Sequence, residues 1–121
     1  EQGTEEWKQL RLGKVTASRV ADVLSKVKTG ESAGRKNYKM ELVVERLTNT
    51  PTESYTSPAM QWGKDNEAQA RVAYEVRSGN FVDQVPFVDH PVISMFGCSP
   101  DGLVNDDGLV EITGQTVQVL T

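Results

Sequence analysis

Hydrophobic and polar positions follow two different periods along the chain. Up to about residue 48, apolar residues recur at spacings of three and four, which is typical of helices with one buried face. Such spacing is clearest in Val20, Val23, Leu24 and Val27, and again in Leu42, Val43 and Leu47. We therefore expect three helices: one opening at Thr4, a second capped by Ser18, and a third over residues 36–48 after a loop over residues 28–35.

A long helix and a set of short strands are expected in the second half. Ser57 is a suitable N-cap because Pro58 follows it at the first helical position, where the missing N–H is not needed. The helix is expected over residues 57–78. From residue 80 onward apolar and polar positions alternate, which predicts strands, and residues 105–108 give the strongest turn signal. Helices followed by a meandering sheet predict an α+β fold.

The composition fits one domain. The chain has 121 residues, of which 37% are hydrophobic and 25% charged, and about two thirds of the unfolded surface can be buried at this length. The single cysteine, Cys98, rules out an intramolecular disulfide and fits a reducing compartment. No apolar run approaches the roughly 20 residues of a membrane helix, and no secretory leader is visible. We expect a cytoplasmic protein without a membrane partner.

The net charge of −4 conceals an asymmetry between the two ends of the chain. Residues 1–46 contain ten basic and seven acidic residues, whereas residues 47–121 contain three basic and ten acidic ones. The segment from Lys8 to Lys39 contains nine basic residues and only two acidic ones, Asp22 and Glu31. A basic segment suggests a polyanionic partner, and an acidic one suggests cations. Two ordinary solvated faces are the alternative.

Two acidic residues flank the predicted turn. Asp101 and Glu111 would lie opposite each other in a bulged hairpin in which Gly108 takes a positive φ. A shift of one residue in the strand pairing would send them to opposite faces of the sheet. Facing carboxylates repel each other unless a cation or proton lies between them, and Mg²⁺ prefers such oxygen ligands. The alternative is an acid-rich hairpin with both side chains in water.

Two further groups of polar residues could have either a functional or a purely structural role. Glu67, on the predicted long helix, could point towards the acids of the hairpin or pair with Arg71 four residues later. Arg11 and Ser18 belong to the junction of the first two helices, where arginine and hydroxyl groups near a helix N-terminus can bind phosphate. In the alternative, Ser18 is only a helix cap and the arginine is solvated.

Four short motifs occur in a fixed order between residues 4 and 112. They are Trp7-x-x-x-Arg11-Leu12-Gly13-x-Val15-Thr16-Ala17-Ser18, Trp62-Gly63-x-x-x-Glu67-x-x-Ala70-Arg71, Ser99-Pro100-Asp101-Gly102-Leu103 and Leu109-Val110-Glu111-Ile112. This set resembles the motifs of the lambda-type phage exonucleases, also called the YqaJ-like viral recombinase family. The resemblance implies a restriction-endonuclease-like core of the PD-(D/E)xK type. In such a core the N-terminal helices and a long helix pack on a small, mainly antiparallel or mixed sheet.

The resemblance implies a metal-dependent exonuclease. Such an enzyme degrades one strand of double-stranded DNA from its 5′ end and serves phage or prophage recombination. Its catalytic residues would be Glu67, Asp101 and Glu111. Magnesium, or manganese in its place, would be held by Asp101, Glu111 and the backbone carbonyl of Ile112.

The same resemblance implies the DNA contacts. Arg11 and Ser18 would bind the terminal phosphate of the DNA, and Ser99 would contact the DNA near the scissile region. The partner would be a double-stranded DNA end. Because members of the family form rings around DNA, the resemblance also allows a homo-oligomer of this chain.

The chain departs from the family pattern after Glu111. The family carries a lysine two residues after this glutamate, and Thr113 stands at that position. Because side chains alternate along a strand, residue 113 shares a face with Glu111. A threonine hydroxyl lacks the charge that orients water and stabilises the transition state, a loss that costs on the order of 10²–10⁴ in rate. The Cys-Pro-containing stretch of the family is missing as well.

These departures predict a single partial exonuclease domain over residues 1–121, truncated at its C-terminal side. It would consist of a basic helical part over 1–48, a long helix over 57–78, and a sheet with the metal-site hairpin over 80–121. Its nuclease activity would be weak or lost. The alternative is a non-catalytic DNA-binding or interaction module, either a decoy or a relic of the nuclease.

Overall fold

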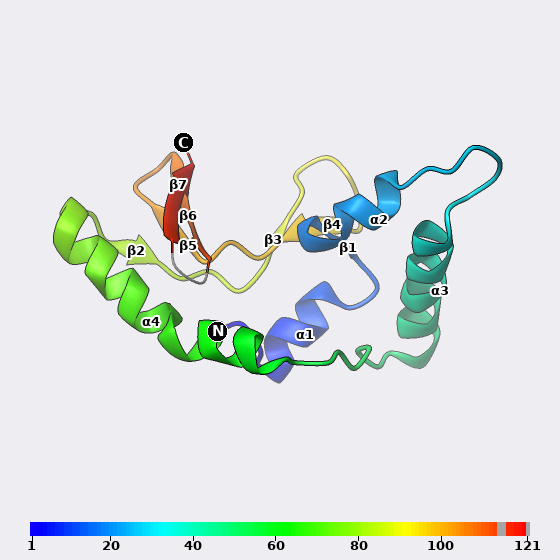
Figure 1. The fold of residues 1–121 in the computed structure, drawn as a ribbon, viewed down its shortest axis with the longest axis horizontal. Helices are drawn as coiled ribbons and strands as arrows, with labels where there is room; N and C mark the ends of the chain where they lie inside the picture. Colours follow the sequence, from blue (N-terminus) through cyan, green and yellow to red (C-terminus); the bar gives the residue numbers. More distant parts are fainter. Residues whose placement is uncertain (114–115, 121) are drawn as a thin grey trace. The chain divides into compact units, whose positions relative to one another are not determined.

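A computed structural model describes residues 1–113 and 116–120 (Figure 1). The chain forms two compact units. The first unit consists of Glu1–Glu53 and Pro86–Ser99, and the second of Ser54–Val85 and Pro100–Thr121. In the described part of the chain, no helix is both long and apolar enough to cross a membrane.

The first unit combines short helices with a small mixed sheet. Its elements are helix α1 (Glu5–Arg11), strand β1 (Val15–Thr16), the 3₁₀ turn η1 (Ala17–Arg19), helices α2 (Val20–Leu24) and α3 (Ala33–Thr48), and strands β3 (Val88–Asp89) and β4 (Phe96–Cys98). The sheet order is β1-β4-β3, with β1 parallel and β3 antiparallel to β4. The parallel pair aligns Val15 with Phe96 and Thr16 with Gly97.

Side-chain caps explain where two of these helices begin. The Thr4 hydroxyl accepts a hydrogen bond from the N–H of Trp7 at 3.3 Å, which confirms the predicted start of α1. Helix α3 begins at Ala33, earlier than predicted, because the Ser32 hydroxyl accepts from the N–H of Arg35 at 3.1 Å. A buried cap of this kind satisfies a donor that the helix itself cannot.

Three local predictions for the first unit are wrong. Ser18 does not cap a helix, because it lies inside the 3₁₀ turn, and α2 then ends at Leu24. The predicted apolar stripe therefore breaks before Val27, which is exposed. In α3 the residue buried is Tyr38, whereas Leu47 of the predicted stripe is 81% exposed. The 3₁₀ turn η1 takes the place of the predicted first turn of the second helix. In α3, tertiary contacts bury a face other than the predicted one.

The second unit packs one long helix with an antiparallel sheet. Its elements are helix α4 (Pro58–Ser78) and strands β2 (Val82–Asp83), β5 (Gly102–Val104), β6 (Gly108–Thr113) and β7 (Thr116–Leu120), in the sheet order β2-β5-β6-β7. Helix α4 contacts β6. The sheet and helix bury Val104 and Val110, and the Val110 side chain is fully enclosed. The α+β prediction is confirmed.

Both ends of α4 lie where the sequence predicts them. The Ser57 hydroxyl accepts from the N–H of Met60 at 3.2 Å, and Pro58 occupies the first helical position. The helix ends at Ser78 and is capped by Gly79, whose φ of 75° is a left-handed conformation that glycine adopts without strain. Its N–H donates to the carbonyl of Glu75 at 2.9 Å.

The hairpin between β5 and β6 forms with the expected register but with a different turn. Gly102 pairs with Val110 and Val104 pairs with Gly108. The positive φ belongs to Asn105, at 54°, and not to Gly108 as predicted. Glycine is needed at position 108 for a different reason: a Cβ there would lie 2.9 Å from the carbonyl oxygen of Val104. Asparagine tolerates the left-handed region better than most residues.

Candidate active site

The hairpin brings the two predicted carboxylates together. Asp101 directly precedes β5, and continuing the observed pairing by one residue places it opposite Glu111 in β6. The Asp101 carboxylate also reaches the neighbouring strand, because its Oδ2 accepts a hydrogen bond from the backbone N–H of Ile112 at 2.7 Å. This bond fixes the Asp101 side chain beside Glu111.

The surroundings of Glu111 are negatively charged. Its half-buried position raises the pKa of the Glu111 carboxyl above its ordinary value by desolvation, and the charges of Asp101 and Glu67 raise it further. A hydrogen bond from the backbone of Asp101 opposes this rise. One acid of the hairpin, Asp101, and one of the helix, Glu67, therefore act on the Glu111 carboxyl.

Glu67 combines the two alternatives that the sequence left open. Its carboxylate pairs with Arg71 one helical turn later, with Nη2 of Arg71 2.7 Å from Oε1 of Glu67, and its charge also acts on Glu111. The Arg71 side chain is only 12% exposed. With the Gln84 amide turned so that its oxygen faces the guanidinium, that oxygen accepts from Arg71 Nη2 at 2.8 Å. Glu67 is thus held on α4 by a largely buried partner.

The donor set fits a hard divalent cation with few protein ligands. Within the described residues, no three His, Cys, Asp or Glu side chains are grouped closely enough to hold a metal ion by themselves. Mg²⁺ usually keeps several waters and binds one or two carboxylates. The juxtaposed Asp101 and Glu111, with the unfavourable charge at Glu111, match that requirement. Thr113, at the end of β6, is exposed and shares a strand face with Glu111.

The first unit contains the three residues predicted to bind phosphate. Arg11 is the last residue of α1, and its guanidinium carbon lies 4.1 Å from the centre of the Trp7 ring. Burial lowers the pKa of the Arg11 guanidinium, and the negative charge of Glu45 opposes this effect. Arg11 therefore stays a cation at neutral pH.

The two serines follow the ends of neighbouring parallel strands. Ser18 lies two residues beyond Thr16 of β1, and Ser99 lies two residues beyond Gly97 of β4, which is the partner of Thr16. The carboxyl ends of parallel strands meet at one edge of a sheet, where ligands commonly bind. Ser18 is exposed, with its Oγ 3.2 Å from the hydroxyl of Thr16.

Trp7 links Arg11 to Ser99. The indole Nε1 donates a hydrogen bond to the Ser99 hydroxyl oxygen at 2.9 Å, while the ring lies against Arg11. Sequence reasoning gave Trp7 no role, although it is one helical turn from Arg11. That spacing places two side chains on the same face of a helix and was the available signal.

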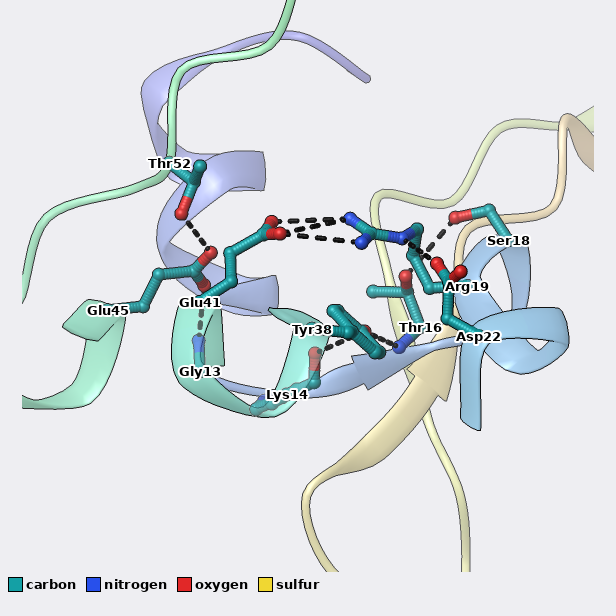
Figure 2. A network of polar contacts seen from close by, with 10 residues as sticks. All are labelled: Gly13, Lys14, Thr16, Ser18, Arg19, Asp22, Tyr38, Glu41, Glu45 and Thr52. Carbon is teal, nitrogen blue, oxygen red and sulfur yellow. Dashed lines mark hydrogen bonds and ion pairs between the residues drawn. The ribbon is translucent and has the colours of Figure 1, made fainter. Parts of the chain in front are cut away.

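A polar network holds the segment that carries Ser18 (Figure 2). Arg19 bridges two helices, with Nε 2.7 Å from Asp22 of α2 and Nη1 3.2 Å from Glu41 of α3. The same guanidinium lies over the Tyr38 ring at 4.2 Å. The buried Tyr38 hydroxyl accepts from the N–H of Thr16 at 3.1 Å.

Glu45 occupies the other end of this network. Its Oε1 accepts from the N–H of Gly13 at 2.9 Å, and its Oε2 accepts from the Thr52 hydroxyl at 2.7 Å (Figure 2). Both carboxylate oxygens are thus used within the protein. Glu45 attracts Arg11 electrostatically, while the Arg11 guanidinium lies over the Trp7 ring.

Much of the charge of the basic segment is paired within the fold. Five of its nine basic residues form ion pairs, which involve Lys8, Lys14, Arg19, Arg35 and Lys39. Their acidic partners include Asp89, from a distant part of the sequence. Most of the basic side chains that the composition suggested for a polyanionic partner therefore pair with acidic residues of the chain itself. Arg11 lies over the Trp7 ring, as Arg19 lies over the Tyr38 ring, but burial lowers the pKa of Arg11.

The structure thus places facing carboxylates in the second unit, and Arg11, Ser18 and Ser99 in the first. Residues 6–119 match the model of the YqaJ-like viral recombinase domain. The chain belongs to this family, as its motifs predicted. No curated protein matches the chain.

Similar solved structures include two of LHK-Exo. One is an alkaline exonuclease, LHK-Exo, from Laribacter hongkongensis, with 51% identity and a TM-score of 0.77 over 89% of this chain and 52% of the other. The second is LHK-Exo in complex with dAMP, with 51% identity and a TM-score of 0.76 over 88% and 51% of the two chains. The chain spans about half the length of these structures. The family and these neighbours support a nuclease role and confirm the α+β exonuclease-type fold.

Proposed function

We propose that the chain is a Mg²⁺-dependent exonuclease domain that acts on the 5′ ends of double-stranded DNA. It would serve phage or prophage recombination in the cytoplasm of a bacterial host. The observation that carries the proposal is the hairpin register of the second unit, which places the Asp101 and Glu111 carboxylates opposite each other. Like charges destabilise a fold, so a cluster of them is typical of a functional site.

Asp101 and Glu111 are the proposed metal ligands, together with the backbone carbonyl of Ile112. The Ile112 N–H holds Oδ2 of Asp101, which restrains the rotation of this carboxylate. Glu67, restrained by Arg71, supplies further negative charge to the same site. A bound divalent ion would lower the pKa of a water and offset the charge that develops on phosphate.

The terminal phosphate of the DNA is assigned to Arg11, Ser18 and Ser99. A guanidinium binds a phosphate through two parallel charge-assisted hydrogen bonds, and hydroxyl groups add further donors. The pairing of β1 with β4 supports this grouping, since it aligns the two serines at one sheet edge. The similar exonuclease binds dAMP, a nucleoside monophosphate of the kind that stepwise DNA hydrolysis releases.

The first experiment is degradation of 5′-phosphorylated linear duplex DNA with Mg²⁺ or Mn²⁺. Asp101→Asn removes one carboxylate charge and should abolish cleavage. Asp106→Asn is the matched control, because it makes the same change at the exposed tip of the same hairpin. Cleavage that survives Asp101→Asn would contradict the proposed site.

A second function follows from one observation, the threonine at position 113. Without a charged group there, the domain would bind DNA ends and cut them slowly or not at all. Binding that persists without cleavage, and that weakens steeply with salt, would identify a non-catalytic DNA-binding module. Absence of both cleavage and end binding would contradict both functions. Self-association into a homo-oligomer stays a prediction, which sedimentation would test.

A further inference from the structure

Trp7 makes two directed contacts that the proposed function does not use. Its ring face lies against the guanidinium of Arg11 at 4.1 Å, and its ring edge donates a hydrogen bond to Ser99 at 2.9 Å. The two partners are 88 residues apart in the sequence, and both belong to the first unit. One side chain therefore touches two of the three residues assigned to the terminal phosphate.

We infer that Trp7 is a positioning residue that orients Arg11 and Ser99 for a 5′-phosphate and thereby sets the preference for phosphorylated over 5′-hydroxyl DNA ends. The inference rests on the proposed function. It goes beyond that function in naming the residue that makes the two ligands act together, and in assigning to it the discrimination between two kinds of DNA end.

The contact with Ser99 determines how its hydroxyl is used. A serine hydroxyl has one proton and two lone pairs, whereas an indole N–H is a donor only. Because Trp7 donates to the Ser99 oxygen, this bond uses a lone pair and leaves the Ser99 proton for an acceptor. Phosphate oxygens are acceptors. The Ser99 backbone is also restrained, since its carbonyl accepts from Nε2 of Gln2 at 3.1 Å.

The contact with Arg11 has a complementary effect. A guanidinium that stacks on a ring uses its face, and its N–H groups point outward in the guanidinium plane. The Trp7 ring thus restricts the guanidinium of Arg11 without occupying its donors. Burial lowers the pKa of Arg11, which reflects partial loss of water around the cation, and an anion would compensate for that loss.

Only tryptophan supplies both contacts from this position. Phenylalanine keeps an aromatic face for Arg11 but has no N–H for Ser99, and leucine has neither. The substitutions Trp7→Phe and Trp7→Leu therefore separate the two contacts. Trp62→Phe is the matched control, because Trp62 is 54% exposed on α4 in the second unit.

The measurement is equilibrium binding of two duplexes that differ only in a 5′-phosphate or 5′-hydroxyl, by fluorescence anisotropy in EDTA, so that DNA is not cut. The ratio of the two dissociation constants gives the preference. We expect Trp7→Phe to lower the preference about fivefold, the value of one net hydrogen bond, and Trp7→Leu to lower it further. Trp62→Phe should leave it unchanged.

A double-mutant cycle tests whether Trp7 acts through Ser99. Ser99→Ala and Trp7→Phe should each lower the preference by a similar factor, and the double variant should lose no more than either one. Thermal denaturation checks that each variant is folded. If Trp7→Leu does not fold, then Trp7→Phe and the cycle still decide the question.

Two results would overturn the inference in different ways. An unchanged preference in Trp7→Phe, or equal weakening on both duplexes, would give Trp7 a purely structural role while the phosphate site stands. A wild-type protein that binds the two duplexes equally would overturn the proposed phosphate site and this inference together.

Discussion

The two units treat charge in opposite ways. In the first, cations and anions alternate in space: Arg19 lies between Asp22 and Glu41, and its charge is balanced by its neighbours. In the second, desolvation and the charges of Asp101 and Glu67 raise the pKa of the Glu111 carboxyl. Paired opposite charges help to specify a fold, whereas gathered like charges oppose it. Paired charges therefore hold the polar network of the first unit together, whereas the like charges around Glu111 favour a bound cation.

The residue at position 113 should give the largest effect. Thr113→Lys places a cation on the strand face of Glu111 and should raise cleavage by on the order of 10²-fold or more, because a positioned charged group is worth that much. Initial rates of duplex degradation measure it. The double variant with Asp101→Asn should stay inactive. If Thr113→Lys changes nothing, the low activity has its cause elsewhere.

Glycine-to-alanine substitutions test whether each unit needs glycine where neighbouring atoms lie close to the backbone. A Cβ at Gly97 in the first unit would lie 2.5 Å from both the Phe87 ring and the carbonyl oxygen of Val88. A Cβ at Gly102 in the second unit would clash with Val82, a side chain that can rotate. We expect Gly97→Ala to lower the free energy of unfolding by about 1–3 kcal/mol, and Gly102→Ala by less.

Urea denaturation measures both glycine variants. Gly63→Ala is the matched control, because its Cβ would meet nothing within 4 Å on helix α4. That change should stabilise the protein by roughly 0.5–1 kcal/mol. Equal losses at Gly97 and Gly102 would mean that the two units tolerate overpacking alike.

Tyr38→Phe should weaken the polar network of the first unit. The hydroxyl accepts from the N–H of Thr16 at 3.1 Å, and its removal leaves this buried donor without that acceptor. Such a loss costs about 1–3 kcal/mol in the free energy of unfolding. Tyr55→Phe, at an 81% exposed tyrosine, should cost nothing measurable. No difference between the two variants would show that the network does not stabilise the unit.

Glu111→Gln should have the smallest effect on stability. Unlike the substitutions above that lower stability, it should raise it. The pKa of Glu111 is raised in the folded state, so folding favours its protonated form. The stability of the metal-free protein should therefore fall as the pH rises through the unfolded and then the folded pKa of this group. Glutamine cannot ionise, so Glu111→Gln should remove this part of the pH dependence and raise the melting temperature near neutral pH.

Melting curves in EDTA between about pH 4 and pH 7 test this prediction. Added Mg²⁺ should raise the melting temperature of the wild type, because a ligand stabilises the state that it binds, and should not raise that of Glu111→Gln. Asp106→Asn, at the exposed hairpin tip, should behave as the wild type does. Identical pH curves for wild type and Glu111→Gln would contradict the like-charge cluster.

The sequence by itself predicted features that depend on neighbours along the chain. The caps Thr4 and Ser57 act on N–H groups three residues away. The facing positions of Asp101 and Glu111 follow from a short hairpin, whose register a few residues determine. The family motifs also predicted the fold class, since the chain matches the family over residues 6–119. Local geometry suffices for such features because only a few backbone angles are involved.

Tertiary structure decided the rest. Whether Lys14 faces solvent or Asp89, 75 residues away, depends on how the strands pair. The same holds for the burial of Tyr38 in place of the predicted stripe of α3, and for the bond between Trp7 and Ser99. No period or spacing encodes these contacts, because each joins residues that only the folded chain brings together. The sequence thus determined which residues could do chemistry, and folding determined which of them meet.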